Sequence, residues 1–323
     1  MTNAIGAIEA GGVKLAGKFV AEVYNIFSKK SYTVDQDNMI LDAFFFTWLA
    51  AGTTPSYQFF SYCGLGTDTS AVTAADTSIT PTADARVSYS LVEPVVKLAT
   101  GSWKSGRGYV FPVRTTSQTV SKLGIYSAVT GGTLSAATLL ASPLNLVAGD
   151  ILTVKHYITS LVDISDRTGL VVLDGNNYPY TMRWWNIDDS FTGATPPWNL
   201  QESTYNVNSN TFGYYGSLDC KQNQILFSNL TGYPSIPSTS GDDTNTVITI
   251  TPDTYTSGNF YRDLTFTANY LQGNTPAGIG NIVFYLSPPL APSCGFVINF
   301  GTTRFPKNNT RELRIKLRFT WGR

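Results

Sequence analysis

The sequence ends on a strict two-residue alternation. Its apolar members are Leu313, Ile315, Leu317, Phe319 and Trp321, and the residues between them are Arg314, Lys316, Arg318 and Thr320. Successive side chains of a β-strand point to opposite faces, so this segment predicts a strand with one apolar and one basic face. The same period occurs at residues 86–91 and 152–158, and Gly-, Ser- and Thr-rich turns separate such segments at short intervals. From Tyr57 onward the pattern therefore predicts an almost purely β fold with the strand spacing of a sandwich.

The first fifty residues show a different pattern, which we interpret as helical. Apolar residues fall near helical spacing over residues 13–27, with charged residues between them; they are Val13, Phe19, Val20, Val23, Tyr24 and Phe27. A second short helix is predicted after Asp37, with Asp37 or Asn38 as its N-cap and Gly52 just beyond its end. Aromatic residues from Phe44 to Trp48 point all round this helix, so more than one side of it needs cover.

These patterns divide the 323 residues into three parts. Residues 1–55 are predicted to form a short N-terminal helical arm, residues 56–160 a β-sandwich domain and residues 161–323 a second β-domain. The second domain is interpreted either as a diverged repeat of the first that carries an insertion, or as an unrelated β-domain with similar turn spacing. The predicted core of the first domain includes Tyr62, Leu65, Ile125, Tyr126, Leu152, Val154 and Ile158.

The composition argues against several classes of partner. Charged residues make up 14% of the chain, and 22 basic residues balance 22 acidic ones. No net field would steer nucleic acid or an anionic membrane, so we expect neither nucleic-acid binding nor membrane insertion. The longest apolar run, residues 39–49, is shorter than the roughly 20 residues that span a bilayer. So few charges suit a surface that neighbouring proteins largely cover.

The sequence lacks the residue patterns of common catalytic, metal-binding and cofactor-binding sites. His156 is the single histidine and lies on the apolar phase of a predicted strand, so it predicts a satisfied core residue and excludes a Ser-His-Asp set. The segment Gly64-Leu65-Gly66 lacks the third glycine of a dinucleotide site. Three distant cysteines, Cys63, Cys220 and Cys294, lack metal-ligand spacing and predict inert core thiols. We therefore predict no enzyme activity, no metal and no cofactor.

Two clusters have a weaker functional interpretation. Asp188 and Asp189 stand near Trp184, Trp185 and Trp198, a combination that a glycosidase or a glycan-binding surface would use. Adjacent carboxylates beside aromatics are more often a solvated loop over a core, so only the tryptophans are kept as candidate glycan contacts. The basic face of the last strand comprises Arg311, Arg314, Lys316, Arg318 and Arg323. It could meet phosphates, but such faces more commonly prevent edge pairing or meet acidic residues.

Several pieces of the first half occur in a characteristic order. A short helix ends at Trp48-Leu49-Ala50-Ala51-Gly52, and an apolar strand then leads into Gly64-Leu65-Gly66-Thr67. A Thr/Ala/Asp-rich stretch ends at Asp76-Thr77. The strand Leu123-Gly124-Ile125-Tyr126 and a hairpin with Ala148-Gly149-Asp150-Ile151-Leu152 complete the series. This order resembles a small β-domain of tailed-bacteriophage structural proteins, found in tail fibres, baseplate pieces and other virion appendages.

The resemblance implies a structural subunit of a tailed-phage virion, in the tail, baseplate, collar or fibre-attachment region. Its partners would be copies of itself in a symmetric assembly and other virion structural proteins, and its location the virion, assembled in the host cytoplasm. Two alternatives stay open: a receptor- or carbohydrate-binding tail protein that contacts a host surface glycan, and a capsid decoration protein. The candidate assembly contacts, taken from the predicted helical arm, are Phe19, Val23, Phe27, Phe45 and Trp48.

Overall fold

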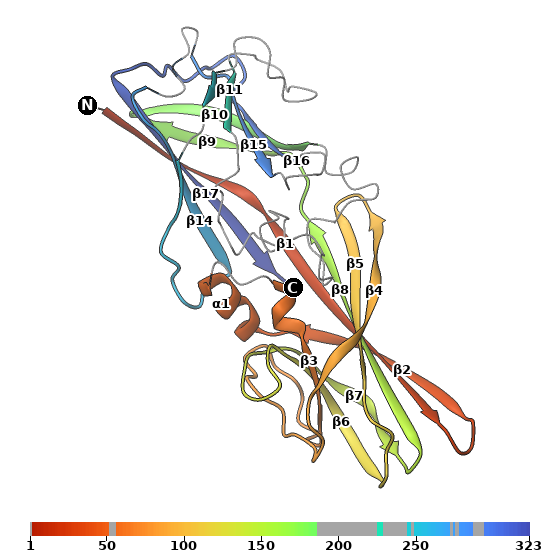
Figure 1. Cartoon of the computed structure of the whole chain (residues 1–323). Helices are drawn as coiled ribbons and strands as arrows, with labels where there is room; N and C mark the ends of the chain where they lie inside the picture. Colours follow the sequence, from red (N-terminus) through yellow and green to blue (C-terminus); the bar gives the residue numbers. More distant parts are fainter. Residues whose placement is uncertain are drawn as a thin grey trace. The chain divides into compact units, whose positions relative to one another are not determined.

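A computed structural model of the chain confirms that the fold is mainly β (Figure 1). It contains one α-helix, α1 (Asp42–Ala51), and one short 3-10 helix, η1 (Ser56–Phe60), among the residues that it describes. The described residues are 2–51, 56–185, 225–228, 244–246, 249–271, 274, 278–286 and 294–323.

The chain forms two compact units, which are described separately below. Unit 2 comprises Val13–Leu161 and Trp321–Arg323 of the described chain. Unit 1 comprises the described residues before Val13 and those between Val162 and Thr320. The N-terminal residues therefore contribute to both units.

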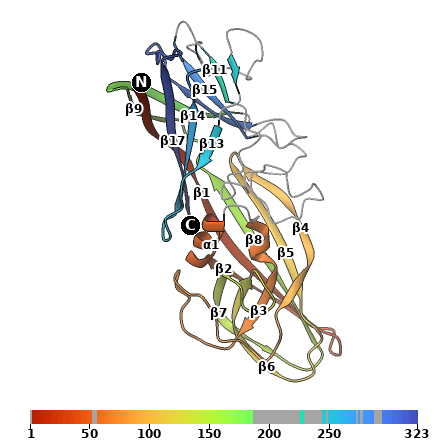
Figure 2. The same cartoon turned by 60° about the vertical axis from the view of Figure 1, so that its left-hand side comes forward.

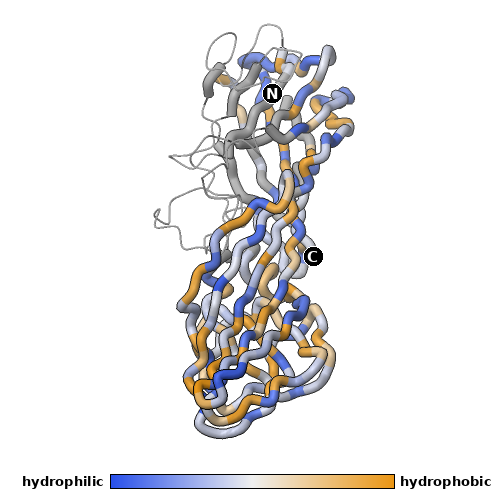
Figure 3. The backbone as a smooth tube through the Cα atoms, turned by 90° about the vertical axis from the view of Figure 1, so that its right-hand side faces the viewer, coloured by the Kyte–Doolittle hydropathy of each residue, from blue (hydrophilic) through white to orange (hydrophobic). Residues whose placement is uncertain are grey.

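Unit 2 is built from eight strands. They are β1 (Thr2–Asn25), β2 (Ser31–Ile40), β3 (Tyr62–Gly66), β4 (Val87–Ala99), β5 (Ser102–Val110), β6 (Gln118–Tyr126), β7 (Leu134–Leu146) and β8 (Asp150–Val162). They are hydrogen-bonded in the order β1-β2-β7-β6-β3-β4-β5-β8, and β8 also pairs with β1. The strand order thus closes on itself, and apolar and polar residues alternate along many of its strands (Figure 3).

The prediction of a helix over residues 13–27 is wrong, because residues 13–25 lie in strand β1 and the last two residues lie in the turn that follows it. The buried side chains of the segment are Val13, Leu15, Phe19, Ala21 and Val23, and Gly17 occupies the remaining position of the same phase. This is a period of two, which the prediction missed by omitting Leu15 and Ala21. Strand β1 pairs antiparallel with β2, from Gly17↔Asn38 to Tyr24↔Ser31. A central strand has stiff β-branched and aromatic residues on its buried face, which favours it over a helix of the same composition.

The second predicted helix is confirmed as α1, but its predicted start is wrong. Strand β2 continues through the predicted caps to Ile40, and the helix begins at Asp42. Phe44, Phe45 and Trp48 are fully buried, and the rings of Phe44 and Trp48 stack with centroids 5.3 Å apart. Aromatics on more than one side of the helix are thus covered within unit 2, as the sequence required.

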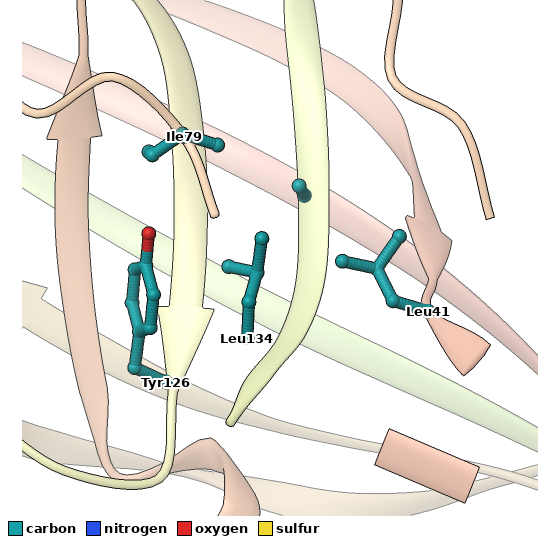
Figure 4. Close-up of a cluster of buried hydrophobic side chains, with 5 residues drawn as sticks. Leu41, Ile79, Tyr126 and Leu134 are labelled. Carbon is teal, nitrogen blue, oxygen red and sulfur yellow. The ribbon is translucent and has the colours of Figure 1, made fainter. Parts of the chain in front are cut away.

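The core predicted for residues 56–160 is confirmed. Leu65, Ile125, Tyr126, Leu152, Val154 and Ile158 are buried, and Tyr62 is half-buried. One cluster joins Leu41, Ile79, Tyr126, Leu134 and Ala137, so the segment just after the Thr/Ala/Asp-rich stretch packs through Ile79 onto β6 and β7 (Figure 4). Segments from four parts of the sequence therefore share one core.

Unit 1 contains strands of two sheets, and β1 belongs to the first of them. In the first, β1 pairs with β17 (Arg311–Gly322), followed by β14 (Tyr261–Ala268) and β13 (Thr249–Pro252). The second has the order β12-β11-β15-β16-β10-β9, with bounds Thr244–Thr246, Ile225–Ser228, Asn281–Leu286, Cys294–Asn299, Asn176–Trp185 and Arg167–Leu173. Strands β9, β11 and β15 of this sheet are labelled in Figure 2. The alternation predicted for the last strand is confirmed: Leu313, Ile315 and Leu317 are buried, whereas Arg314 and Arg318 are exposed.

Candidate assembly surfaces

The candidate assembly contacts from the sequence separate into two groups. Phe19, Val23, Phe45 and Trp48 are at most 2% exposed and pack inside unit 2. They pack in the core of the chain itself, so they are not candidates for contacts with other molecules. Phe27 is 74% exposed and is the one member of the set that a neighbouring molecule could reach.

Phe27 lies in the turn between β1 and β2, and that turn is tightly hydrogen-bonded. The side-chain oxygen of Asn25 accepts hydrogen bonds from the backbone N–H groups of Phe27 (3.0 Å) and Ser28 (2.9 Å). The side-chain nitrogen of Asn25 donates to the Ala148 carbonyl (3.1 Å) and to the Asp150 carboxylate (2.7 Å). Asparagine suits this position because its side chain satisfies turn donors that the ladder leaves unpaired. The turn is thereby fixed to the start of β8.

The ring of Phe27 lies against the backbone of Gly149. A Cβ atom on Gly149 would come within 2.3 Å of a ring carbon, and Gly149 adopts a φ of 89°. The N–H of Ile26 donates to the Gly149 carbonyl at 2.9 Å. Glycine is required here both by the left-handed backbone and by the close approach of the ring. One edge of the ring is thus supported while most of it faces outward.

Other exposed residues lie on or near this turn. Tyr32 and Val147 are 45% and 47% exposed. Burial, and then the Asp150 carboxylate, raise the pKa of the Tyr32 hydroxyl. The N–H of Val147 donates to the same carboxylate at 2.8 Å. Lys29 and Lys30 are exposed at the turn and form no ion pair with the described part of the chain. We call Phe27, Lys29, Lys30, Tyr32 and Val147 the tip patch.

Strand β4 forms a second exposed apolar surface. It pairs with β3 only at Val87 and Ser88, whereas its ladder with β5 extends to Ala99. Beyond Ser88, β5 is its only ladder partner among the described strands. Four aliphatic side chains on this stretch are 42–52% exposed: Leu91, Val92, Val96 and Leu98. The sequence pattern predicted a strand only up to Leu91; the apolar run around Pro94, with proline typical of an edge, was the signal for the rest.

The basic face of β17 is neutralised within the chain. Each predicted member has a carboxylate partner: Arg311 with Asp174, Arg314 with Glu312, Lys316 with Asp253, Arg318 with Asp263 and Arg323 with Asp42. The Arg318 pair is bidentate, with both distances 2.8 Å. These pairs disfavour a phosphate-binding role for this face, because a nucleic acid would have to displace the carboxylates.

The tryptophan cluster is only partly described. Trp184 and Trp185 lie in β10, opposite Phe296 and Gly295 of β16. Trp198, Asp188 and Asp189 lie outside the described residues. The glycan-contact prediction therefore stays a prediction.

His156 is fully buried, as predicted, but its hydrogen bonding differs from the prediction. Its ring lies 4.8 Å from that of Phe19 and 5.6 Å from that of Phe60, and neither ring nitrogen has a hydrogen-bond partner among the described residues. Burial, and then the nearby Arg107 guanidinium, lower the pKa of His156 to about 3. The imidazole is thus neutral at physiological pH and shielded from any substrate.

The Cys63 thiol is also buried. Burial raises the pKa of the Cys63 thiol, so it stays protonated and unreactive. No group of three His, Cys, Asp or Glu residues within the described ranges could hold a metal ion. No helix in that part of the chain is long and apolar enough to cross a membrane.

Comparisons with protein-family models, with curated proteins and with solved structures find no match to this chain.

Proposed function

We propose that the chain is a structural subunit of a tailed-phage virion, in the tail, baseplate, collar or fibre-attachment region. It acts by assembly with copies of itself and with neighbouring virion proteins. The observation that carries the assembly role is strand β4, where four aliphatic side chains within eight residues are more than two-fifths exposed. The virion context rests on the order of sequence pieces that resembles phage appendage domains.

Exposed aliphatics on one strand are costly unless something covers them. Single exposed apolar residues are ordinary, but a contiguous group commonly marks an interaction surface. Burial of apolar area contributes roughly 25 cal/mol per Å², so a partner that covers any of these side chains gains stability from each one before its ordering costs. A chain in which only 14% of residues are charged has little electrostatic means of keeping such surfaces apart.

The partner would cover β4 by side-chain packing and not by adding a strand. Pro94 has no N–H to donate, and the β4–β5 ladder has three register shifts between Tyr89 and Ala99. Prolines and bulges prevent edge-to-edge pairing. In this proposal the two units act as consecutive sandwich-like building blocks, and many weak contacts of this kind add up through symmetry.

Charge insertion on β4 tests the proposal. Val92→Lys combined with Leu98→Lys should abolish self-association of the full chain in sedimentation velocity at concentrations where the wild type associates. Leu170→Lys with Val172→Lys is the matched control, because these exposed residues lie on β9 of unit 1. Gold-labelled antibody should mark the chain on the tail of phage particles. A monomeric wild type, equal association of both double variants, or label confined to capsid faces would contradict the proposal.

A further inference from the structure

We infer that the tip patch is an anchor for an acidic-rimmed apolar pocket on another protein, with Phe27 inserted and Lys29 and Lys30 facing carboxylates. The inference rests on the proposed function only in taking that protein to be a virion neighbour. It concerns a different surface from β4.

The geometry of the patch is that of a pre-organised anchor. An aromatic side chain on a fixed backbone loses little conformational entropy on binding, and such residues dominate interface energies. Asn25 fixes the turn on both sides, through the N–H groups of Phe27 and Ser28 and through Ala148 and Asp150. The Phe27 ring, supported by Gly149 and yet 74% exposed, is presented in one orientation.

The charge of the patch selects the kind of protein surface. Lys29 and Lys30 are exposed and have no carboxylate partner in the described chain, whereas the basic residues of β17 all have one. Contact between two identical tips would set four lysines against each other, and like charges across an interface are unfavourable. The complementary surface is therefore acidic and differs from the tip itself.

The same charges are too few for a lipid or nucleic-acid partner. Recognition of anionic membranes commonly uses clusters of about 4–8 basic residues, and a nucleic acid site neutralises several phosphates. Two lysines beside one inserted ring fit a protein pocket, where the ring provides most of the affinity and the lysines orient the approach.

A photo-crosslinking experiment tests the inference. Benzoylphenylalanine in place of Phe27 in the full chain, produced in cells together with the other virion proteins, should crosslink to one peptide that contains Asp or Glu. Lys29→Glu with Lys30→Glu should lower that yield about tenfold, with a larger loss at low salt. Without the crosslinker, Phe27→Ala should weaken co-purification of the crosslinked protein by roughly 30-fold, as expected of a hot-spot aromatic.

Controls separate the possible outcomes. Benzoylphenylalanine at Val129, an exposed position on another turn, should not label the same peptide, and Leu271→Ala, at an 87% exposed side chain, should leave co-purification unchanged. Hydrogen exchange over β1 and β2 checks that each variant is folded. The inference would be overturned if Phe27 crosslinked to the tip patch of another copy, to a peptide without carboxylates or to no protein. Lysine-dependent binding of the chain to phosphatidylserine vesicles would also overturn it. An acidic partner from outside the virion would keep it and refute the proposed function.

Discussion

Among the described residues each unit buries one lysine, and the two units do so by different means. Lys122 in unit 2 and Lys307 in unit 1 are both 2% exposed. The ammonium group of Lys122 contacts the Asp68 carboxylate and, at 2.9 Å, the Ser70 hydroxyl. The ammonium group of Lys307 donates to three neutral oxygens, those of the Asn269 carbonyl, the Asn274 side chain and the Asn308 carbonyl, at 2.9–3.1 Å. One charge is compensated by an opposite charge and the other by dipoles.

The two lysines differ in which parts of the structure they hold together. Asp68 also accepts a hydrogen bond from the N–H of Thr80 at 3.1 Å, so the ion pair fixes the long loop after β3 to strand β6. Burial alone would raise the pKa of the Asp68 carboxyl, but hydrogen bonds from Lys122, Ser70 and Thr80 hold it below its usual range. For Lys307, burial lowers the pKa of the ammonium group. The ion pair should therefore stabilise its unit more than the neutral cage does.

Asp68→Asn is expected to have the largest effect, because it leaves the buried ammonium of Lys122 without an opposite charge. Removing one partner of a buried pair costs about 3–5 kcal/mol, and the partial exposure of Asp68 places this case near 3. Urea unfolding would measure the loss, and hydrogen exchange should locate it in β3 and β6. Ser70→Ala is the matched control, since it removes one neutral hydrogen bond worth about 1 kcal/mol. Equal losses in the two variants would mean that the charge pair is not what stabilises the loop.

Acid should remove the same stabilisation from the wild type. The pKa of Asp68 is lower in the folded chain than in the unfolded one, so its contribution is complete above about pH 4 and is lost as pH falls through the folded value. The stability gap between wild type and Asp68→Asn should be constant from about pH 7 to about pH 5 and then narrow. Other carboxylates titrate equally in both proteins and cancel in the difference. A gap that persists undiminished down to pH 2 to 3 would contradict a role for the ionised carboxylate.

Lys307→Met should cost less than Asp68→Asn. The change leaves three oxygens without one donor, at about 1–3 kcal/mol, but it also removes the desolvation cost of the charge. We expect a net loss of about 1 kcal/mol, measured by urea unfolding and located by hydrogen exchange around residues 268–271 and 305–311. Lys307→Gln, which keeps a donor without the charge, should fall between wild type and Lys307→Met. A loss of stability as large as that of Asp68→Asn would show that the neutral oxygens around Lys307 stabilise the fold as much as the ion pair of Lys122 does.

The sequence predicted strand β17 and missed β1 for a reason that concerns the residues themselves. In β17 the polar phase is charged, so the period of two is unmistakable. In β1 the polar phase includes Ala16 and Val20, and the buried phase includes Gly17 and Ala21, so small residues blur the contrast and leave a few large ones near helical spacing. Lys122 could not be predicted as buried, because its partner Asp68 is distant in sequence and meets it only in the folded chain.

The candidate surfaces were predicted in part, and for an incorrect reason. Phe27 was chosen as part of a helix face, yet it is exposed because it lies in a turn that Asn25 and Gly149 hold. Phe19 and Val23 were chosen for the same face and belong to the core. The exposed aliphatics of β4 depend on which strands flank it, and strand order follows from contacts across the whole unit, which local periodicity does not encode.

The smallest expected effect is an alkaline one on the Lys307 cage, and its sign distinguishes the two lysines. Burial sets the pKa of Lys307 in the folded chain below the unfolded value, with the Glu312 carboxylate acting in the opposite direction. Below the pKa of Lys307 in the folded chain, the cost of burying its charge is fully present. As pH rises through that pKa towards about 10.5, the amine loses its proton in the folded chain while it stays protonated in the unfolded chain, so the cost to stability is relieved. The wild type should therefore gain stability relative to Lys307→Met as pH rises towards about 10.5, measured by urea unfolding of both proteins in parallel. Tyrosine ionisation is common to the two proteins and cancels. A gap that narrows over this range would show that the neutral oxygens favour the charged amine over the neutral one, and the cage would then resemble the Asp68 pair in its effect.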